Sequence, residues 1–264
     1  MSRIDQTFKR LRKKGQAALI PFVVAGDPDL ERTEALVFKM AESGADIIEL
    51  GVPYSNPFAD GPTIQASSQR ALQNGINLRE IFLLTQRLKG ITLPLVLMTY
   101  FNPILQYGLR DFAESCKQSK IDGVLVSDLP SEEAGPWIQE ARKYDLDTPF
   151  LLFPKSSIEK IKIVVELSRG FVYYASVRGP TGVREKLPKG LEYSVRQVKR
   201  YCQKPVVVGF GISSPEHVEE VSHFVDGVVV GSAIVKIIEE NLKNSIIINK
   251  VGNFVYSLTH ALKS

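Results

Sequence analysis

Two carboxylates stand near one another in the sequence, around the end of an apolar run. Glu49 lies within the run 46–52, and Asp60 lies in the loop beyond it, which contains Pro53, Pro57 and Pro62. Loss of water in an apolar setting favours a neutral carboxyl group, so the pKa of Glu49 should rise toward neutrality. The prolines restrict the backbone around Asp60. A lone carboxylate would more often be a salt-bridged strand end or a cap, but this pair predicts an acid–base site.

A second chemical feature follows two late apolar runs. Segment 206–213 contains Gly211, and segment 228–233 contains Gly231 and Ser232 just before a predicted helix. Glycines let backbone N–H groups approach an anion, and a helix N-terminus adds partial positive charge. One glycine alone is more often a turn or a cap, but two in adjacent units predict a phosphate site. The expected substrate is a phosphate ester.

The segment 177–186 is long, polar and glycine-rich. It is typical of a lid that closes over a bound phosphate, expels water and brings Thr181 and Gly182 to the site. A plain surface loop is an equally good interpretation.

Other polar residues carry weaker signals. Tyr173 lies inside a predicted strand and is by default structural, although its outer end could reach the pocket. Asp128 follows a strand and could cap the next helix or orient a substrate group. Lys155 lies in a polar loop that would not activate an amine for Schiff-base chemistry. No metal site is expected, because the spacings of the three histidines do not give a two-histidine face; they are His217, His223 and His260.

The elements that must position these residues alternate regularly. Short β-branched runs predict strands at 18–24, 47–50, 94–98, 123–126, 150–153, 171–175, 206–208 and 227–230. Amphipathic segments predict helices at 30–43, 78–89, 109–119, 132–144, 158–168, 193–201, 215–223 and 233–241. Eight such units favour an α/β fold of the (β/α)8 TIM-barrel type, with a doubly wound open sheet as the alternative. Added helices are expected at 4–14, 65–73 and 246–262.

Composition limits the class of protein. The chain has 264 residues, 44% hydrophobic residues and a formal charge of +4, and no linker divides it, so we expect one domain over 1–264. The basic cluster 9–14 has no second cluster to support nucleic-acid binding and is interpreted as a solvated helix face. Pro21 and Asp27 argue against a signal peptide, and no apolar run approaches a membrane span. With two separated cysteines, a cytoplasmic protein with reduced thiols is expected.

Several motifs together resemble a known family. They cover nearly the whole chain and comprise segments 21–28, 49–65, 100–104, 128–130, 209–213 and 231–235. The chain resembles the α subunit of tryptophan synthase, and the segment from Glu49 to Thr63 is the most specific part of the likeness.

The resemblance implies a lyase that cleaves indole-3-glycerol phosphate to indole and glyceraldehyde 3-phosphate, with no metal or organic cofactor in this subunit. It implies that Glu49 moves protons, that Asp60 accepts the indole N–H and that Tyr173 assists near the reacting hydroxyl. It further implies an indole pocket formed by Phe22, Ile64, Tyr100 and Phe210. The phosphate site would be formed by Gly182, Gly211, Gly231 and Ser232, next to Thr181 in the lid.

The resemblance also implies a partner. Family members associate as an αββα complex with a pyridoxal-phosphate-dependent β subunit, to which indole passes through a tunnel. The contact should involve the loop around Asn56 and segment 102–107, and closure of the lid would signal to the partner.

Some residues depart from the family pattern. Pro180 follows Gly179 in the predicted lid, and Tyr54 and Asn56 replace a common Phe and Asp. Two alternatives therefore stay open: a weakly active subunit that mainly activates the β subunit, and another phosphate-binding barrel such as an isomerase or aldolase.

Overall fold

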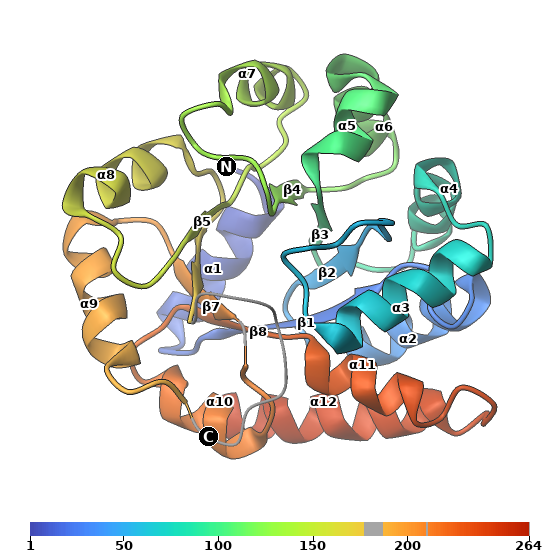
Figure 1. Cartoon of the computed structure of the whole chain (residues 1–264). Coiled ribbons are helices and arrows are strands. Elements are labelled where there is room, and N and C mark those ends of the chain that lie inside the picture. Colours follow the sequence, from blue (N-terminus) through green and yellow to red (C-terminus); the bar gives the residue numbers. More distant parts are fainter. Residues whose placement is uncertain (177–186, 210, 264) are drawn as a thin grey trace.

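Eight parallel strands form one sheet, which curves into a nearly closed barrel with helices around it (Figure 1). The computed structural model describes residues 1–176, 187–209 and 211–263. The strands are β1 (Ala18–Val24), β2 (Ile48–Gly51), β3 (Leu95–Thr99), β4 (Gly123–Val126), β5 (Phe150–Leu152), β6 (Val172–Ala175), β7 (Val206–Gly209) and β8 (Gly227–Val230).

The strand order distinguishes a barrel from an open sheet. The order is β4-β3-β2-β1-β8-β7-β6-β5, so the first and last strands pair, with Ala18 opposite Gly227. The two ends of this order meet at a parallel bridge between Gly123 and Asp147, where the Val124 N–H donates to the Asp147 carbonyl at 2.9 Å. The predicted TIM barrel is confirmed. The strands are almost wholly buried and rich in β-branched residues because the barrel interior covers one face and helices cover the other.

A ring of helices covers the barrel in Figure 1. The helices are α1 (Arg3–Lys13), α2 (Leu30–Glu42), α3 (Pro62–Gln73), α4 (Leu78–Arg87), α5 (Phe101–Tyr107), α6 (Leu109–Gln118), α7 (Gly135–Lys143), α8 (Ile158–Leu167), α9 (Leu191–Tyr201), α10 (Pro215–Ser222), α11 (Ser232–Glu239) and α12 (Ile247–Lys263). Within the described part of the chain, no helix is both long and apolar enough to cross a membrane.

Helix boundaries differ from the predictions where proline or a distant cap decides them. α3 begins at Pro62 rather than at residue 65, because proline suits the first helical position. α7 begins at Gly135 rather than at residue 132, again with a proline in its first turn. α5 was not predicted. The Phe101 N–H at its start donates to the Asp128 carboxylate at 2.7 Å, so its cap comes from the loop after β4.

Candidate active site

A pocket with about 420 Å³ of empty space lies at the carboxyl ends of the strands. Side chains from five strands surround it, together with residues of the loops that follow β2, β7 and β8 and of the first turns of α3 and α11. They are Phe22, Glu49, Asp60, Ile64, Met98, Tyr173, Gly211, Ile212, Val229, Gly231 and Ser232. Eight of the predicted site residues are therefore together in one pocket: Phe22, Glu49, Asp60, Ile64, Tyr173, Gly211, Gly231 and Ser232.

Glu49 enters this pocket from β2, where its strand neighbours are Phe22 and Val96. Its side chain is 1% exposed, and among the described residues neither carboxyl oxygen has a hydrogen-bond partner. Burial, followed by the negative charge of Asp60, raises the pKa of Glu49 to about 8. The carboxyl group is therefore mostly protonated at neutral pH and can donate its proton to a bound molecule.

Asp60 is buried but has a specific donor. Its Oδ2 accepts a hydrogen bond from the Tyr100 hydroxyl at 3.0 Å, and that hydroxyl accepts the Ala59 N–H at 3.0 Å. Burial raises the pKa of Asp60 to about 6, although the bond from Tyr100 opposes the rise. Asp60 is thus ionised at a pH where Glu49 still holds its proton. Two carboxyl groups with separated pKa values can take different roles in one reaction.

The loop that carries Asp60 is fixed by its own backbone and by the next helix. The Asp60 N–H donates to the Pro57 carbonyl at 3.0 Å, and the Gln65 amide donates to the Asp60 carbonyl at 2.8 Å. The predicted constraint on the second carboxylate is therefore present, and a helical side chain adds to the effect of the prolines.

Tyr173 lies on β6 with its ring buried in the barrel. Burial and the charges of Glu49 and Asp60 raise its pKa well above the usual value, so the phenol stays protonated. Its position depends on Gly209 of the neighbouring strand, because a Cβ at residue 209 would lie 2.0 Å from the Tyr173 hydroxyl oxygen. The sequence motif includes Gly209, but this role could not be read from it.

Residues suited to bind an anion form another part of the pocket wall. Gly211 has a φ of 87°, which favours glycine. Gly231 is the N-cap of α11, and it supplies no side-chain cap for the helix that begins at Ser232. The first N–H groups of a helix have no acceptor within the helix, so they are free to bind phosphate oxygens.

The predicted substrate-binding residue Tyr100 lines an adjoining pocket with about 250 Å³ of empty space. Phe22, Asp60, Ile64 and Met98 line both pockets, so the two spaces share a wall. Tyr100 bonds to Asp60 and can therefore act on the substrate through that carboxylate.

Met98, Ile212 and Val229 line the main pocket but were not predicted. Their position at or just after strand ends is the signal that could have identified them. Conversely, the predicted residues Thr181, Gly182 and Phe210 lie outside the described residues, as does the lid segment 177–186.

The weaker candidates have other surroundings. Asp128 accepts the Phe101 N–H at the start of α5 and so does not cap the next helix in the chain. Lys155 is exposed. Within the described residues, no cluster of three or more His, Cys, Asp or Glu side chains could hold a metal ion.

Comparison with known proteins identifies the family. Residues 8–261 match the family model described as "Tryptophan synthase alpha chain". The chain belongs to the tryptophan synthase alpha chain family. A relative with that name from Geobacter sulfurreducens is 47% identical over 263 residues, which cover 99% of each chain. Another, from Thermoanaerobacter, is 43% identical over 99% of this chain and 100% of the relative.

Solved structures of family members agree with this assignment. A Mycobacterium tuberculosis tryptophan synthase chain is 34% identical, with a TM-score of 0.92 over 100% of this chain and 99% of the other. A tryptophan synthase α subunit from Legionella pneumophila is 34% identical, with a TM-score of 0.91 over 99% and 98%. Membership places the chain among the lyases of tryptophan biosynthesis and implies a β chain as partner.

Proposed function

We propose that this chain cleaves indole-3-glycerol phosphate to indole and glyceraldehyde 3-phosphate by a retro-aldol reaction, and that indole passes to a β chain for tryptophan synthesis. The observation that carries the proposal is the pair of acids: Glu49 is buried, protonated near neutral pH and beside the ionisable Asp60. The same pocket reaches the start of α11, which suits the phosphate end of this substrate.

The proposed reaction begins with Glu49 as an acid. Its carboxyl proton moves to the indole carbon that bears the glycerol chain, and the ring becomes an iminium cation. The Asp60 carboxylate accepts the indole N–H and stabilises that positive charge. This order suits the raised pKa of Glu49, because the neutral form is the one present at the start.

Glu49 then acts as a base. Its carboxylate takes the proton of the hydroxyl on the carbon attached to the ring, that oxygen becomes the aldehyde carbonyl, and the carbon–carbon bond breaks. The bonding electron pair returns to the ring and neutralises the iminium. One proton has entered and one has left, so Glu49 returns to its neutral form. Tyr173, held protonated in the same pocket, would donate a hydrogen bond near the reacting hydroxyl.

Phosphate binding is assigned to Gly211, Gly231 and Ser232, whose positions around the N-terminus of α11 support it. Thr181 and Gly182 are proposed to complete the site when segment 177–186 closes. Phe22 and Ile64 supply apolar wall for the indole ring, and Phe210 is proposed to join them.

The proposed complex is α2β2, with pyridoxal phosphate bound by the β chain and no organic cofactor or metal in this chain. Its contact surface would include the loop around Asn56 and α5. In support, this surface exposes two large apolar side chains that a partner could cover, Phe58 by 64% and Leu105 on α5 by 51%. The Phe58 ring lies against Tyr100, 5.5 Å between centroids, so this surface adjoins the residue that bonds to Asp60.

Indole release from indole-3-glycerol phosphate tests the proposal directly. Replacing Glu49 with Gln should lower kcat by about 10³-fold or more, because one group supplies both proton transfers. Affinity for the non-cleavable analogue indole-3-propyl phosphate should stay within about twofold, since Gln keeps the size and polarity of the neutral acid. An unchanged kcat would refute the role of Glu49. Activation of a β chain without indole release would instead favour a regulatory subunit.

Ser232→Asp tests the phosphate site. A carboxylate there should repel the phosphate and weaken glycerol 3-phosphate binding by about tenfold or more. Ser232→Asn is the matched control, because it has the same shape without the charge. Equal affinity in the two variants would place the phosphate elsewhere.

A further inference from the structure

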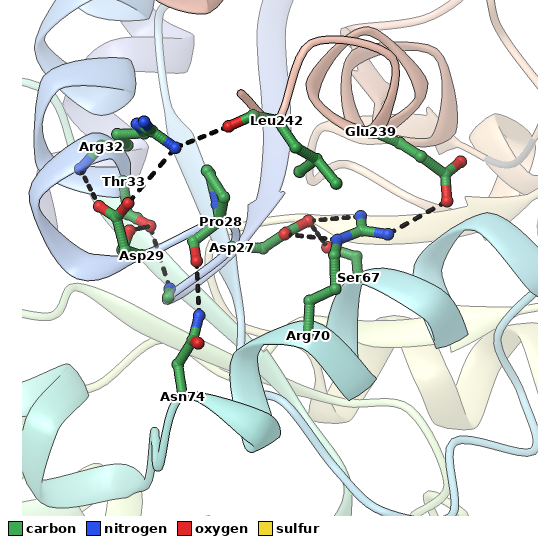
Figure 2. A network of polar contacts seen from close by, with 11 residues as sticks. Asp27, Pro28, Asp29, Arg32, Thr33, Ser67, Arg70, Asn74, Glu239 and Leu242 are labelled. Atoms are coloured by element: carbon green, nitrogen blue, oxygen red, sulfur yellow. Dashed lines mark hydrogen bonds and ion pairs between the residues drawn. The ribbon is translucent and has the colours of Figure 1, made fainter. Parts of the chain in front are cut away.

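Arg70 connects three segments of the chain that are far apart in the sequence (Figure 2). It lies on α3, and its Nε and Nη2 donate to the two carboxylate oxygens of Asp27, both at 2.8 Å. Asp27 follows β1, is 1% exposed and also accepts a hydrogen bond from the Ser67 hydroxyl. Arg70 also donates from Nη1 to a carboxylate oxygen of Glu239 at 3.1 Å. Glu239 is the last residue of α11.

The geometry of these contacts makes the arrangement specific. A planar guanidinium that bonds both oxygens of one carboxylate has little freedom to rotate. Since Asp27 is buried, the pair gains more from each bond than a surface pair would. Glu239 is on the outer side, with 42% of its side chain exposed, so its bond can be removed without leaving a charge buried.

Two further hydrogen bonds are made by the turn that carries Asp27 and by α2, the helix that follows it. The side-chain amide of Asn74, at the end of α3, donates to the Pro28 carbonyl at 2.5 Å. Arg32, at the start of α2, donates to the Leu242 carbonyl beyond α11 at 2.8 Å. Figure 2 shows the turn bonded to α3 through Asn74, and the start of α2 bonded through Arg32 to the segment after α11. The turn and the first residues of α2 therefore contact both α3 and the end of α11.

Both of these helices start at the pocket. α3 begins at Pro62, two positions after Asp60, and places Ile64 in the wall, whereas α11 begins at Ser232. The N-cap of each is a glycine without a side-chain cap, Gly61 in one and Gly231 in the other. The two helices also pack against each other, and they lie side by side in Figure 1. Their pocket ends are thus positioned by packing and by contacts farther along each helix.

We propose that Arg70 is a positioning residue that fixes the distance between the acid and phosphate ends of the pocket by clamping α3 to α11 through Asp27 and Glu239. This inference rests on the proposed function for the identity of the two ligand ends. A ligand that spans the pocket must fit Asp60 and the start of α11 at once, so it senses their separation. A ligand that contacts only one end is not sensitive to that separation.

The test compares ligands of the two kinds in the full-length chain. Indole-3-propyl phosphate spans the pocket, whereas indole and glycerol 3-phosphate each occupy one end. The main variant is Glu239→Gln, which cuts the bond to α11 and leaves the buried Asp27–Arg70 pair intact. Glu240→Gln is the matched control, because it removes the same charge from the next residue, whose weak partner is Lys236 at 4.0 Å. Arg70→Lys keeps the charge but loses the two-oxygen contact.

We expect Glu239→Gln to weaken binding of the spanning ligand by about threefold to tenfold, and Arg70→Lys by about tenfold or more, because small misplacements are costly when two ends must fit together. Affinity for indole and for glycerol 3-phosphate should stay within about twofold in both variants. With substrate, kcat/KM should fall in parallel with affinity for the spanning ligand. The Glu240→Gln chain should match wild type throughout.

A measurement without ligand separates this inference from the proposed function. Amides 65–68 and 235–238, which begin with the first hydrogen-bonded N–H groups of α3 and α11, should exchange hydrogen faster in Glu239→Gln than in Glu240→Gln. Equal exchange in the two variants would overturn the inference whether or not the wild-type chain cleaves the substrate. Equal loss of affinity for one-ended and spanning ligands would also overturn it, since that pattern indicates general loosening. Indole release by the wild-type chain tests the function alone.

Discussion

The Tyr100 hydroxyl should set the acid limit of activity through Asp60. It donates to Asp60 Oδ2 at 3.0 Å and lowers a pKa that burial has raised to about 6. Tyr100→Phe removes this donor and keeps the ring that stacks on Tyr54, 4.9 Å between centroids. Because the bond favours the ionised carboxylate, its loss must raise the pKa of Asp60.

The size of the shift follows from the bond. A hydrogen bond to a charged group contributes about 1.5–3 kcal/mol, and one pKa unit corresponds to about 1.4 kcal/mol. We take the lower end, because water can enter the space that the hydroxyl leaves, and expect the pKa of Asp60 to rise by about one unit. Asp60 must be ionised to stabilise the iminium, so the acid limb of kcat/KM should move up by the same amount. The basic limb reports Glu49, whose pKa is raised to about 8, and should stay in place.

The assay is kcat/KM for indole-3-glycerol phosphate between pH 5 and 9.5. The wild-type profile should be a bell, and Tyr100→Phe should narrow it from the acid side. Tyr54→Phe is the matched control, since it removes a hydroxyl from the neighbouring stacked ring and leaves the bond to Asp60. An acid limb that stays in place in Tyr100→Phe, or moves to lower pH, would show that Asp60 does not control that limb.

Two further predictions concern stability. The pKa of Glu49 is raised from 4.5 to about 8, so the folded chain keeps a proton that the unfolded chain releases, and stability falls as pH rises through this interval. Glu49→Gln should therefore match wild type near pH 5 within about 1 kcal/mol and exceed it by roughly 4 kcal/mol at pH 8. Urea unfolding at the two pH values measures this, and a constant difference would contradict it. Gly209→Ala should cost about 1–3 kcal/mol, because the new Cβ meets the hydroxyl and two ring carbons of Tyr173. Gly135→Ala, in open space, should not destabilise. A smaller cost of Gly209→Ala in a Tyr173→Ala background, which removes the ring, would confirm the clash.

The sequence was sufficient to predict the barrel, because each strand and most helices carry a local pattern. The runs in β1 and β8 are continuous and β-branched, as buried parallel strands require. The acids were also predictable, since the apolar flanks of Glu49 and the prolines around Asp60 are local features.

Features that depend on distant residues were not predictable. The cap of α5 comes from Asp128, which is separated from Phe101 by 27 positions, so no local start signal precedes that helix. Arg70 looks like an ordinary helical surface residue until the fold brings Asp27 to it. The room for Tyr173 depends on a glycine of the neighbouring strand, and a single sequence does not show which strands are neighbours.

The location of the acids within the barrel follows from how firmly its strands are joined. The pocket's strand residues come from β1, β2, β3, β6 and β8, and none of the described pocket residues comes from β4 or β5. Between β4 and β5 the described residues show only the bridge of Gly123 with Asp147, which lies three positions before β5. The neighbouring Asp122 accepts a hydrogen bond from Arg3 of α1 at 2.9 Å. Glu49 instead lies on a strand paired on both sides. A buried carboxyl group without a partner destabilises its surroundings when it ionises, and a strand with two neighbours resists the resulting displacement better than one at a seam. A barrel that is joined least extensively between β4 and β5 can therefore still hold Glu49 to a fixed geometry, because β2 lies away from that seam and pairs with β1 and β3.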